Sequence, residues 1–570
     1  MKKNIVLLLF TLLCSACLGV STEEKKQDVV IDEKDAEITI TKPYIRWLFA
    51  GFGFQNSEAE FTALMDDEFL NQRALKTFRE ISPTFCRVYA GFADVSKEQM
   101  DRFAEYYHKT FKEADTTLYA APGCMPAFPD QINVEEYAEK VAKNLSYLIK
   151  EKDCRKIRYY CLTNELTCGD QFSYFTRFNK MELFKAYNVA LYKAFLKYGL
   201  DIQLLATDDT ATTKPYRVLD SLKWAMDNMN DYVGAYCTHW YVYGRRADDL
   251  NLWNECNEYF NTLVQLSINK NRRHILGEWG FSPTFRKRGI MVDDLGYNLR
   301  QPEKATESVL SKLEVGVAAM NAGSYACVSW SFVDYPDPYV IVDGHTPESR
   351  AIYEASKCGY KMDLKYNKWG IFRWDSVDKN YSAYPEMYAI GYLAKLFKKN
   401  ATVLPTKSNN FMVRSGSIIN RDGSVSIVVI NRGKEKDLKI NSQQPFNKNL
   451  RMYVYEADNV PFNEFNDLQS HKCVIKPTSK NSFSVKLPAR SACFFTTDYQ
   501  DRIPSAINNI FIKDGKLVWD KSSDKEHCYY RVYKNGKQIA STVATYVKVN
   551  DTDVSLYSVK SVDKWGNVRR

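Results

Sequence analysis

Two short stretches decide the fold: YYCLTNE at Tyr159–Glu165 and HILGEWG at His274–Gly280. Each is a run of residues that favour β-strands, and each carries a glutamate, Glu165 directly after Asn164 in the first and Glu278 in the second. Two carboxylates at the carboxyl ends of two well-separated strands are typical of a site on a β/α barrel. Because Asn-Glu and Gly-Glu pairs are common by chance, this interpretation requires six further strands.

Strand-like and helix-like segments alternate along the chain. The other six predicted strands are Ile45–Gly51, Thr84–Tyr89, Thr117–Ala121, Ile202–Thr207, Val233–Cys237 and Tyr325–Trp330. Between them, Met181–Tyr198 places apolar residues at three- and four-residue intervals, and residues 134–152, 218–229 and 304–320 show the same helical spacing. Eight such units predict an α/β protein with a (β/α)8 TIM barrel. The alternative, a doubly wound open sheet, is disfavoured by the count of eight and by the lack of G-x-G-x-x-G after the first strand.

Changes in texture divide the 570-residue chain into domains. We assign residues 43–398 to the barrel, which ends in a predicted helix at Pro385–Lys398. Residues 399–500 carry short alternating strands and predict a β-sandwich, to which the alternating stretch at 36–41 is a candidate extra strand. Residues 504–570 contain a turn at Asn535-Gly536 between alternating runs, which indicates a small fibronectin type III-like β domain.

The amino terminus has the pattern of an export signal. Two lysines precede an apolar stretch at residues 5–13, which is too short to span a membrane, and Ser15-Ala16-Cys17 follows. This triplet resembles a bacterial lipobox, so we expect a signal peptide at 1–17, lipidation of Cys17 and a tether at 18–42. Cys14 stands where that pattern usually has leucine, and ordinary cleavage nearby is the alternative. The expectation is an exported lipoprotein, at the outer membrane, on the cell surface or facing the periplasm, that contacts the membrane only through the lipid.

Composition limits the partners. The net charge of +9 is spread without a Lys/Arg block, so we expect no nucleic-acid partner. Aromatic residues make up 14% of the chain, which suits stacking on sugar rings but equally suits an aromatic core. The twelve cysteines beyond Cys17 form no C-x-x-C pair and no Cys/His ligand set, so no metal is predicted. Buried thiols and one or two disulfides both remain open.

On these motifs the chain resembles the clan A retaining glycoside hydrolases over roughly residues 43–398. The barrel followed by two β domains is most similar to family 39, which contains β-xylosidases and α-L-iduronidases, and families 30 and 5 are close competitors. The chain departs from the common Asn-Glu-Pro pattern, since Asn164-Glu165 is followed by Leu166. The resemblance implies double displacement at two carboxylates about 5–5.5 Å apart, with no metal or organic cofactor.

The resemblance also implies residue roles. Glu165 would be the general acid and then the base, and Glu278 the nucleophile. Asn164 would bind the 2-hydroxyl of the sugar, and Arg87 would keep Glu278 ionised. For each of these charged residues, a purely structural ion pair at a strand end is the competing interpretation.

Three further residues match positions of the superfamily. His239 and Tyr241 fit a His-x-Tyr pattern after strand six, with His239 contacting sugar and Tyr241 the nucleophile. Trp330, at the end of strand eight, would floor the sugar subsite, although a packing role is a rival. Asp208 and Asp209 are weaker candidates, because tandem acids after a strand are often helix caps.

The sequence thus predicts a retaining β-glycosidase that hydrolyses a poly- or oligosaccharide. The alternative from another class is a non-catalytic, surface glycan-binding lipoprotein on a degenerate barrel. Degenerate sites usually lack one carboxylate, whereas Glu165 and Glu278 are both present.

Overall fold

The computed structural model describes residues 35–43, 47–56, 64, 66–90, 92–122, 131–167, 174–211, 215–242, 250–281, 285–287, 290–292, 302–333, 370–375 and 380–569. All of them belong to one compact unit. Cys17, the predicted signal peptide and most of the tether lie outside the described residues. Among the helices that are described, none is long and apolar enough to cross a membrane.

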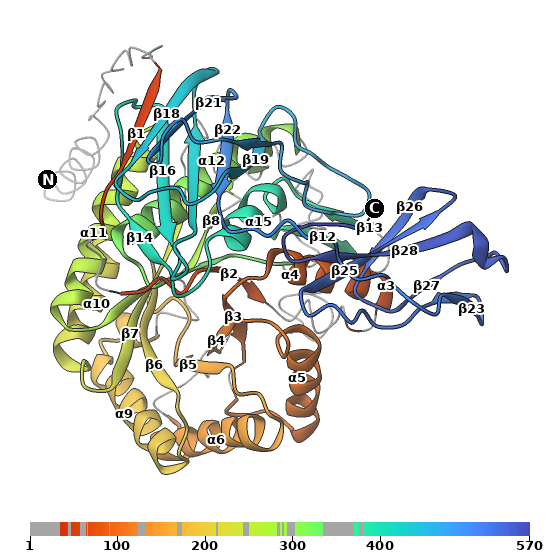
Figure 1. Cartoon of the computed structure of the whole chain (residues 1–570). Helices are drawn as coiled ribbons and strands as arrows, with labels where there is room; N and C mark the ends of the chain where they lie inside the picture. The colour runs from red at the N-terminus through yellow and green to blue at the C-terminus, as the bar shows by residue number, and fades with distance from the viewer. Residues whose placement is uncertain are drawn as a thin grey trace, which may run out of the picture. The chain divides into compact units, whose positions relative to one another are not determined.

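Eight parallel strands close into a barrel in the order β11-β2-β3-β4-β5-β6-β7-β8 (Figure 1). Their bounds are β2 Phe52–Asn56, β3 Phe85–Tyr89, β4 Thr117–Ala121, β5 Ile157–Cys161, β6 Gln203–Ala211, β7 Val233–Val242, β8 Arg273–Phe281 and β11 Ala326–Ser329. The predicted barrel is confirmed, and the open-sheet alternative is wrong because β11 pairs with both β2 and β8.

The predicted first strand is wrong in its position. We expected it at Ile45–Gly51, whereas β2 begins at Phe52. Gly51 has a φ of +102°, and a Cβ there would lie 1.8 Å from Thr84 Oγ1, so the chain bends tightly before the strand begins. Within β2, Phe52 and Phe54 face the surrounding helices, while Gly53 leaves room for the backbone of Phe85.

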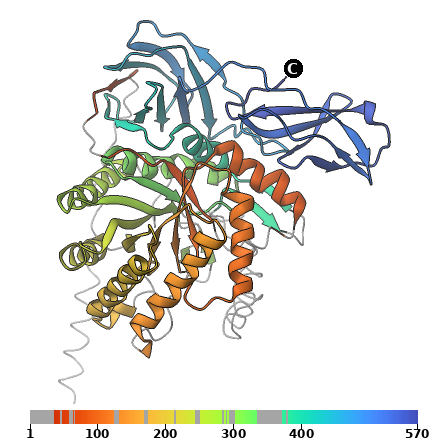
Figure 2. The same ribbon diagram turned by 60° about the horizontal axis from the view of Figure 1, so that its bottom comes forward.

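Helices cover the outside of the barrel (Figure 2). Their bounds are α3 Asp67–Phe69, η1 Leu70–Ala74, α4 Leu75–Ile81, α5 Lys97–Thr110, α6 Val134–Ser146, η3 Tyr147–Glu151, α8 Tyr174–Arg177, α9 Met181–Lys197, α10 Pro215–Asn228, α11 Leu252–Asn269, α12 Pro302–Ala322 and α15 Met387–Leu396. The five helices predicted within residues 43–398 are confirmed with small shifts at their ends. Local sequence also determines where a helix begins. The Ser96 side chain, for example, accepts a hydrogen bond from the Gln99 backbone N–H in a capping box at the start of α5.

Apolar side chains fill the barrel interior below its carboxyl end. They come from every second position of the strands and include Phe85, Tyr119, Tyr159, Leu205, Ala235, Ile275 and Val328. The alternate positions pack against the helices. The inner side chains nearest the carboxyl ends of the strands are polar, and they form the site described below.

After α15 the described chain is mostly β-structure. One sheet has the order β14-β16-β17-β22-β19-β20 and another the order β15-β1-β18-β21. Their bounds are β1 Ala36–Ile40, β14 Thr402–Leu404, β15 Thr406–Ser408, β16 Val413–Ile419, β17 Val425–Asn431, β18 Lys436–Ser442, β19 Leu450–Glu456, β20 Cys473–Ile475, β21 Ser482–Leu487 and β22 Ser491–Thr496. Strand β1 lies beside β18 although the two are far apart in sequence (Figure 1), so the predicted extra strand at 36–41 is present. Side chains of both sheets form one apolar cluster.

Two three-stranded sheets follow, in the orders β23-β24-β27 and β26-β25-β28. Their bounds are β23 Phe511–Lys513, β24 Lys516–Val518, β25 His527–Lys534, β26 Lys537–Thr542, β27 Tyr546–Lys548 and β28 Tyr557–Asp563, with the short helix η4 at Val554–Leu556. The Asn535-Gly536 turn joins β25 to β26, as predicted. Two hairpins lie in the long segments after β8 and β11: β9 Phe285–Lys287 with β10 Ile290–Val292, and β12 Phe372–Asp375 with β13 Asn380–Ala383.

The described cysteines are nine free thiols, of which only Cys473 is exposed. Most therefore behave as small buried apolar residues, in agreement with the first of the two interpretations above.

Candidate active site

Glu278 faces the barrel interior because strand β8 contains a bulge. Thr238 of β7 pairs with Leu276, but the next residue, His239, pairs with Glu278, so Gly277 is an extra residue. Leu276 and Trp279 face the helices. The bulge therefore turns two consecutive residues, Gly277 and Glu278, toward the interior and leaves the Glu278 side chain almost fully buried.

Three side chains hold the Glu278 carboxylate. The guanidinium of Arg87, on β3, forms an ion pair with Oε1. The hydroxyl of Tyr241, on β7, donates to Oε2 at 2.6 Å, and the hydroxyl of Tyr89 lies 3.5 Å from Oε1. A cation and hydroxyl donors both stabilise the ionised form of a carboxylate.

We expected Glu165 at the end of its strand. It lies instead in the loop after β5, because β5 ends at Cys161. Its backbone is in the left-handed region at a φ of +52°, and its N–H donates to the Asp208 carbonyl at 2.7 Å. Two residues on, the N–H and hydroxyl of Thr167 donate to Asp209 Oδ1. The loop that carries Glu165 is thus tied to β6 at this residue and again two residues later.

His239 lies between the two glutamates. Its Nδ1 is 3.3 Å from Glu165 Oε1 and 3.4 Å from Glu278 Oε2. One carboxylate oxygen of Glu165 and one of Glu278 lie within 4.8 Å of each other. Inverting glycosidases need about 6.5–9.5 Å between their carboxyl groups to admit a water, and retaining ones about 5–5.5 Å. The two carboxylates therefore face each other across the end of the barrel, close enough to act on one glycosidic bond.

Arg87 connects the remaining polar groups. Its Nη2 lies 2.7 Å from Asn164 Oδ1 and 2.7 Å from Asp208 Oδ2, while Nη1 contacts Glu278. The Arg87 side chain is fully buried, and its guanidinium carbon lies 4.8 Å from the centre of the Tyr89 ring. One planar guanidinium thus fixes three partners on three different elements.

Asp208 and Asp209 have opposite electrostatic environments although they are neighbours and both are buried. For Asp208, burial favours the neutral form, but Arg87 and His239 outweigh it and lower the pKa to about 2. Within the described part of the chain, Asp209 accepts from neutral groups, including the Ser221 hydroxyl on α10, and burial raises its pKa to about 6. For His239, burial lowers the pKa, but Asp208 and Glu165 outweigh that effect and the net pKa is raised.

Trp330 lies at the same end of the barrel. Its side chain is buried, and its ring centre is 5.6 Å from that of Tyr89, which is half-buried. Tyr89 in turn contacts Glu278. The two rings therefore form an aromatic surface next to the carboxylate.

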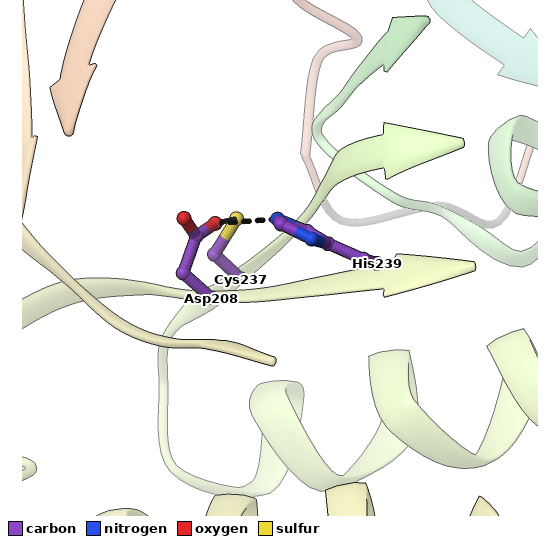
Figure 3. Close-up of side chains that lie close together, drawn as sticks. All are labelled: Asp208, Cys237 and His239. Carbon is purple, nitrogen blue, oxygen red and sulfur yellow. Dashed lines mark hydrogen bonds and ion pairs between the residues drawn. The ribbon is translucent and has the colours of Figure 1, made fainter. Parts of the chain in front are cut away.

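Among the described residues, two sets of side chains have ligand atoms close enough to reach one cation: Asp208, Cys237 and His239 (Figure 3), and Glu165, His239 and Glu278. In each set Arg87 already forms an ion pair with a carboxylate. Its positive charge neutralises the negative charge that would attract a cation. We therefore interpret both sets as parts of one hydrogen-bonded network.

The structure brings together every predicted site residue that it describes. Arg87, Asn164, Glu165, His239, Tyr241 and Glu278 form one connected network, and Trp330 joins it through Tyr89.

Tyr89, Cys237 and Gly277 also lie at this site and were not among the residues predicted from the sequence, and Asp208 was predicted only as a weaker candidate. Tyr89 stands two residues after Arg87 on one strand, so strand alternation alone places both on the same face. Neither aspartate is a helix cap: Asp208 faces Arg87 and His239, and Asp209 faces Ser221 and Thr167.

Searches with family models and against curated proteins found no match. Solved structures do match. A bacterial orthologue of human α-L-iduronidase is 12% identical, with a TM-score of 0.55, and the match covers 94% of this chain and 98% of that one. An endo-β-1,6-glucanase is 15% identical with a TM-score of 0.53, covering 81% and 94%. A family 30 xylanase from Talaromyces cellulolyticus is 14% identical with a TM-score of 0.50, covering 81% and 99%. The chain therefore shares the barrel fold of these glycoside hydrolases.

Proposed function

We propose that this chain is a retaining β-glycosidase that cleaves a poly- or oligosaccharide by double displacement. The observation that carries the proposal is the pair of carboxylates, Glu165 and Glu278, which face each other at the carboxyl end of the barrel with one oxygen of each within 4.8 Å of the other.

In this reaction Glu278 attacks the anomeric carbon while Glu165 gives its proton to the departing glycosidic oxygen. The C–O bond to the leaving group breaks as the ester bond to Glu278 forms. Glu165, now a carboxylate, then takes a proton from the water that attacks the anomeric carbon and releases Glu278. Asn164 binds the 2-hydroxyl, and Tyr89 and Trp330 pack against the sugar. No metal or organic cofactor takes part.

The contacts of Glu278 support its role as the nucleophile. It is held by a buried guanidinium and by the Tyr241 hydroxyl, which favour its ionised form. Among the described residues no guanidinium pairs with Glu165, and its side chain is more exposed, at 15% against 3% for Glu278. This asymmetry matches an acid that must release and regain a proton and a nucleophile that must stay ionised.

The family assignment and the accessory domains belong to the same proposal. The match to the iduronidase orthologue covers 94% of the chain and so extends beyond the barrel, which supports an architecture like that of family 39. The shared apolar cluster of the two larger sheets supports a β-sandwich. The apolar cluster formed by the two smaller sheets, which includes Trp519, supports a fibronectin type III-like domain.

The test is a screen of aryl β-glycosides and polysaccharides with the wild type and with Glu165→Gln, Glu278→Gln and, as a control, Glu139→Gln, which changes a surface glutamate paired with Lys197. We expect both site variants to lose at least about 1,000-fold in kcat and the control to match the wild type.

Azide separates the two roles. With Glu165→Ala, azide should yield a glycosyl azide of the substrate's anomeric configuration, and with Glu278→Gly one of the opposite configuration. Sugar binding without turnover across the panel would contradict the proposal and favour the glycan-binding lipoprotein.

We further propose that Cys17 is lipidated and anchors the protein to the exterior face of a membrane. In cells, Cys17→Ser should move the protein from the membrane fraction to the soluble fraction and abolish labelling by a fatty-acid analogue. Unchanged fractionation without labelling in the wild type would favour ordinary signal cleavage.

A further inference from the structure

Asp208 contacts both of the basic side chains that contact Glu278. Its Oδ2 lies 2.7 Å from Arg87 Nη2, and its Oδ1 lies 3.0 Å from His239 Nε2. Arg87 and His239 each touch Glu278 with another atom. Asp208 itself is fully buried, and it lies behind these two side chains as seen from the glutamates.

A bulge in β6 positions the Asp208 carboxylate. Thr207 pairs with Cys237 and Asp209 with Thr238, so Asp208 is an extra residue in β6, and its φ is +53°. The bulge turns Asp208 inward, whereas Asp209 faces α10. The thiol of Cys237 donates to Asp208 Oδ1 at 2.9 Å, beside His239 (Figure 3).

The absence of a side chain at Gly277 leaves room for the Asp208 carboxylate and its neighbours. A Cβ at this position would lie 2.4 Å from Cys237 Sγ, 2.7 Å from the Tyr119 hydroxyl and 2.9 Å from Asp208 Oδ1. Any side chain on Gly277 would therefore displace Asp208 or the groups that hold it. Two bulges, one in β6 and one in β8, thus bring Asp208 and Gly277 together inside the barrel.

We propose that Asp208 is a positioning residue that orients His239 and Arg87 toward Glu165 and Glu278; its part in catalysis rests on the glycosidase function proposed above. An ionised carboxylate can only accept hydrogen bonds, so His239 must carry a proton on Nε2 to meet it. Nδ1 is then the nitrogen that faces both glutamates, and when protonated it donates to them.

The covalent intermediate gives Asp208 a second task. When Glu278 becomes an ester it loses its negative charge, and Arg87 would be left buried without a counter-ion. Asp208 remains ionised against Arg87 through this step, so the guanidinium does not have to move between the two half-reactions.

The ionisable groups that face His239 come from several elements. Asp208 on β6 and Glu165 after β5 favour its protonated form, and Glu278 on β8 lies 3.4 Å from Nδ1. Arg87 on β3 disfavours the protonated form, as does burial. Burial and Arg87 lower the pKa of His239, and the negative charge of Asp208 counteracts them. Without that charge the pKa of His239 should fall.

The direct test is Asp208→Asn, which keeps the shape of the side chain and removes its charge. In full-length protein with 13C-labelled histidine, the His239 signal is the one of six that disappears in His239→Asn. We expect its pKa to fall by about 1 or more in Asp208→Asn. The matched control is Asp209→Asn, which removes the adjacent buried carboxylate facing the other way and should leave the His239 pKa unchanged. An identical His239 titration in Asp208→Asn and wild type would overturn the proposal.

A second measurement uses turnover. Asp208→Asn should lower kcat by on the order of 10- to 100-fold with KM within about threefold, since Asp208 touches no substrate. The alkaline limb of the kcat/KM profile should move to lower pH. Unchanged kcat with an active wild type would overturn the role in catalysis. If the wild type has no glycosidase activity but the His239 titration shifts as expected, Asp208 still positions His239 and only the proposed function fails.

Gly277→Ala provides a variant that keeps the charge and disturbs the placement. We expect a similar fall in kcat and a changed His239 titration, with the fold checked by circular dichroism. If Asp208→Asn does not fold, Gly277→Ala still tests the proposal. A folded Gly277→Ala protein with wild-type kcat and wild-type His239 titration would overturn the proposal.

Discussion

Single residues at the carboxyl end of the barrel differ in electrostatic environment according to the direction in which a strand turns them. Asp208 and Asp209 are neighbours, yet their pKa values are displaced in opposite directions, to about 2 and about 6. The difference arises because Asp208 meets two basic side chains, whereas the described partners of Asp209 are hydroxyl and backbone donors.

This difference predicts how Asp209 affects stability. Its folded pKa of about 6 is above the ordinary 3.8, so the folded state binds the proton more tightly than the unfolded state. The stabilisation is fully present below about pH 4 and is lost as pH rises through 6. We expect Asp209→Asn to gain in melting temperature relative to the wild type between pH 4 and 7. Asp94→Asn, at an exposed site, is the control. A difference in melting temperature between Asp209→Asn and the wild type that stays constant with pH would contradict this linkage.

Tyr241 carries a second prediction at this scale. Its hydroxyl donates to Glu278 at 2.6 Å, and a hydrogen bond to a charged group contributes about 1.5–3 kcal/mol. Tyr241→Phe should therefore lower kcat/KM by roughly 10- to 100-fold on the substrate found in the screen. Tyr236→Phe is the matched control, because Tyr236 is on the same strand but donates to Asn230 outside the site. Equal activity of the two variants would show that this contact does not act in turnover.

At the level of elements, β1 shows how a short terminal segment completes a sheet. It pairs in parallel with β18 and antiparallel with β15, so its removal would expose two strand edges. Ile38 and Ile40 are fully buried in the apolar cluster, whereas Thr39 between them is exposed.

We expect Ile38→Ala to lower the free energy of unfolding by about 2–5 kcal/mol, because it removes buried methyl groups and leaves a cavity. Thr39→Ala, one residue away on the opposite face, should change it by less than about 0.5 kcal/mol. Urea denaturation followed by tryptophan fluorescence measures both. Similar values for the two variants would indicate that β1 does not pack against the sheets in solution.

At the level of the whole molecule, buried ion pairs join the barrel to the β-structure that follows it. Lys76, on α4, is fully buried and lies 2.9 Å from Glu80 and 2.8 Å from Asp467. Glu80 also accepts from the Leu468 backbone, and Asp467 pairs with Arg531 in the last domain. One cluster therefore includes residues from the barrel, the β19–β20 connection and the C-terminal sheets.

Lys76→Met should destabilise the protein by about 3–5 kcal/mol, because Glu80 and Asp467 would stay buried without their shared cation. In calorimetry we expect a lower melting temperature and earlier proteolysis of the C-terminal sheets. Lys112→Met, at an exposed lysine, is the control. An unchanged melting temperature would mean that the three regions are stabilised independently.

The sequence by itself determined the parts that depend on local pattern. Strand alternation and helical spacing predicted the eight-stranded barrel and its helices, because the side chains that face the core recur at the period of each element. The two glutamates were found at the ends of two predicted strands, whereas Arg87, Asn164, His239 and Tyr241 were predicted from the resemblance to the clan A glycoside hydrolases. The first strand was misplaced because the bend at Gly51 depends on Thr84, which is distant in sequence.

Only the tertiary structure decided how these residues meet. The bulges at Asp208 and Gly277 are visible only as mismatches between neighbouring strands, so no single segment encodes them. The importance of Asp208 follows from Arg87 on β3 and His239 on β7, which approach it when the barrel closes. Local sequence sets which side chains point inward, whereas the charge that each one meets is set by residues far along the chain.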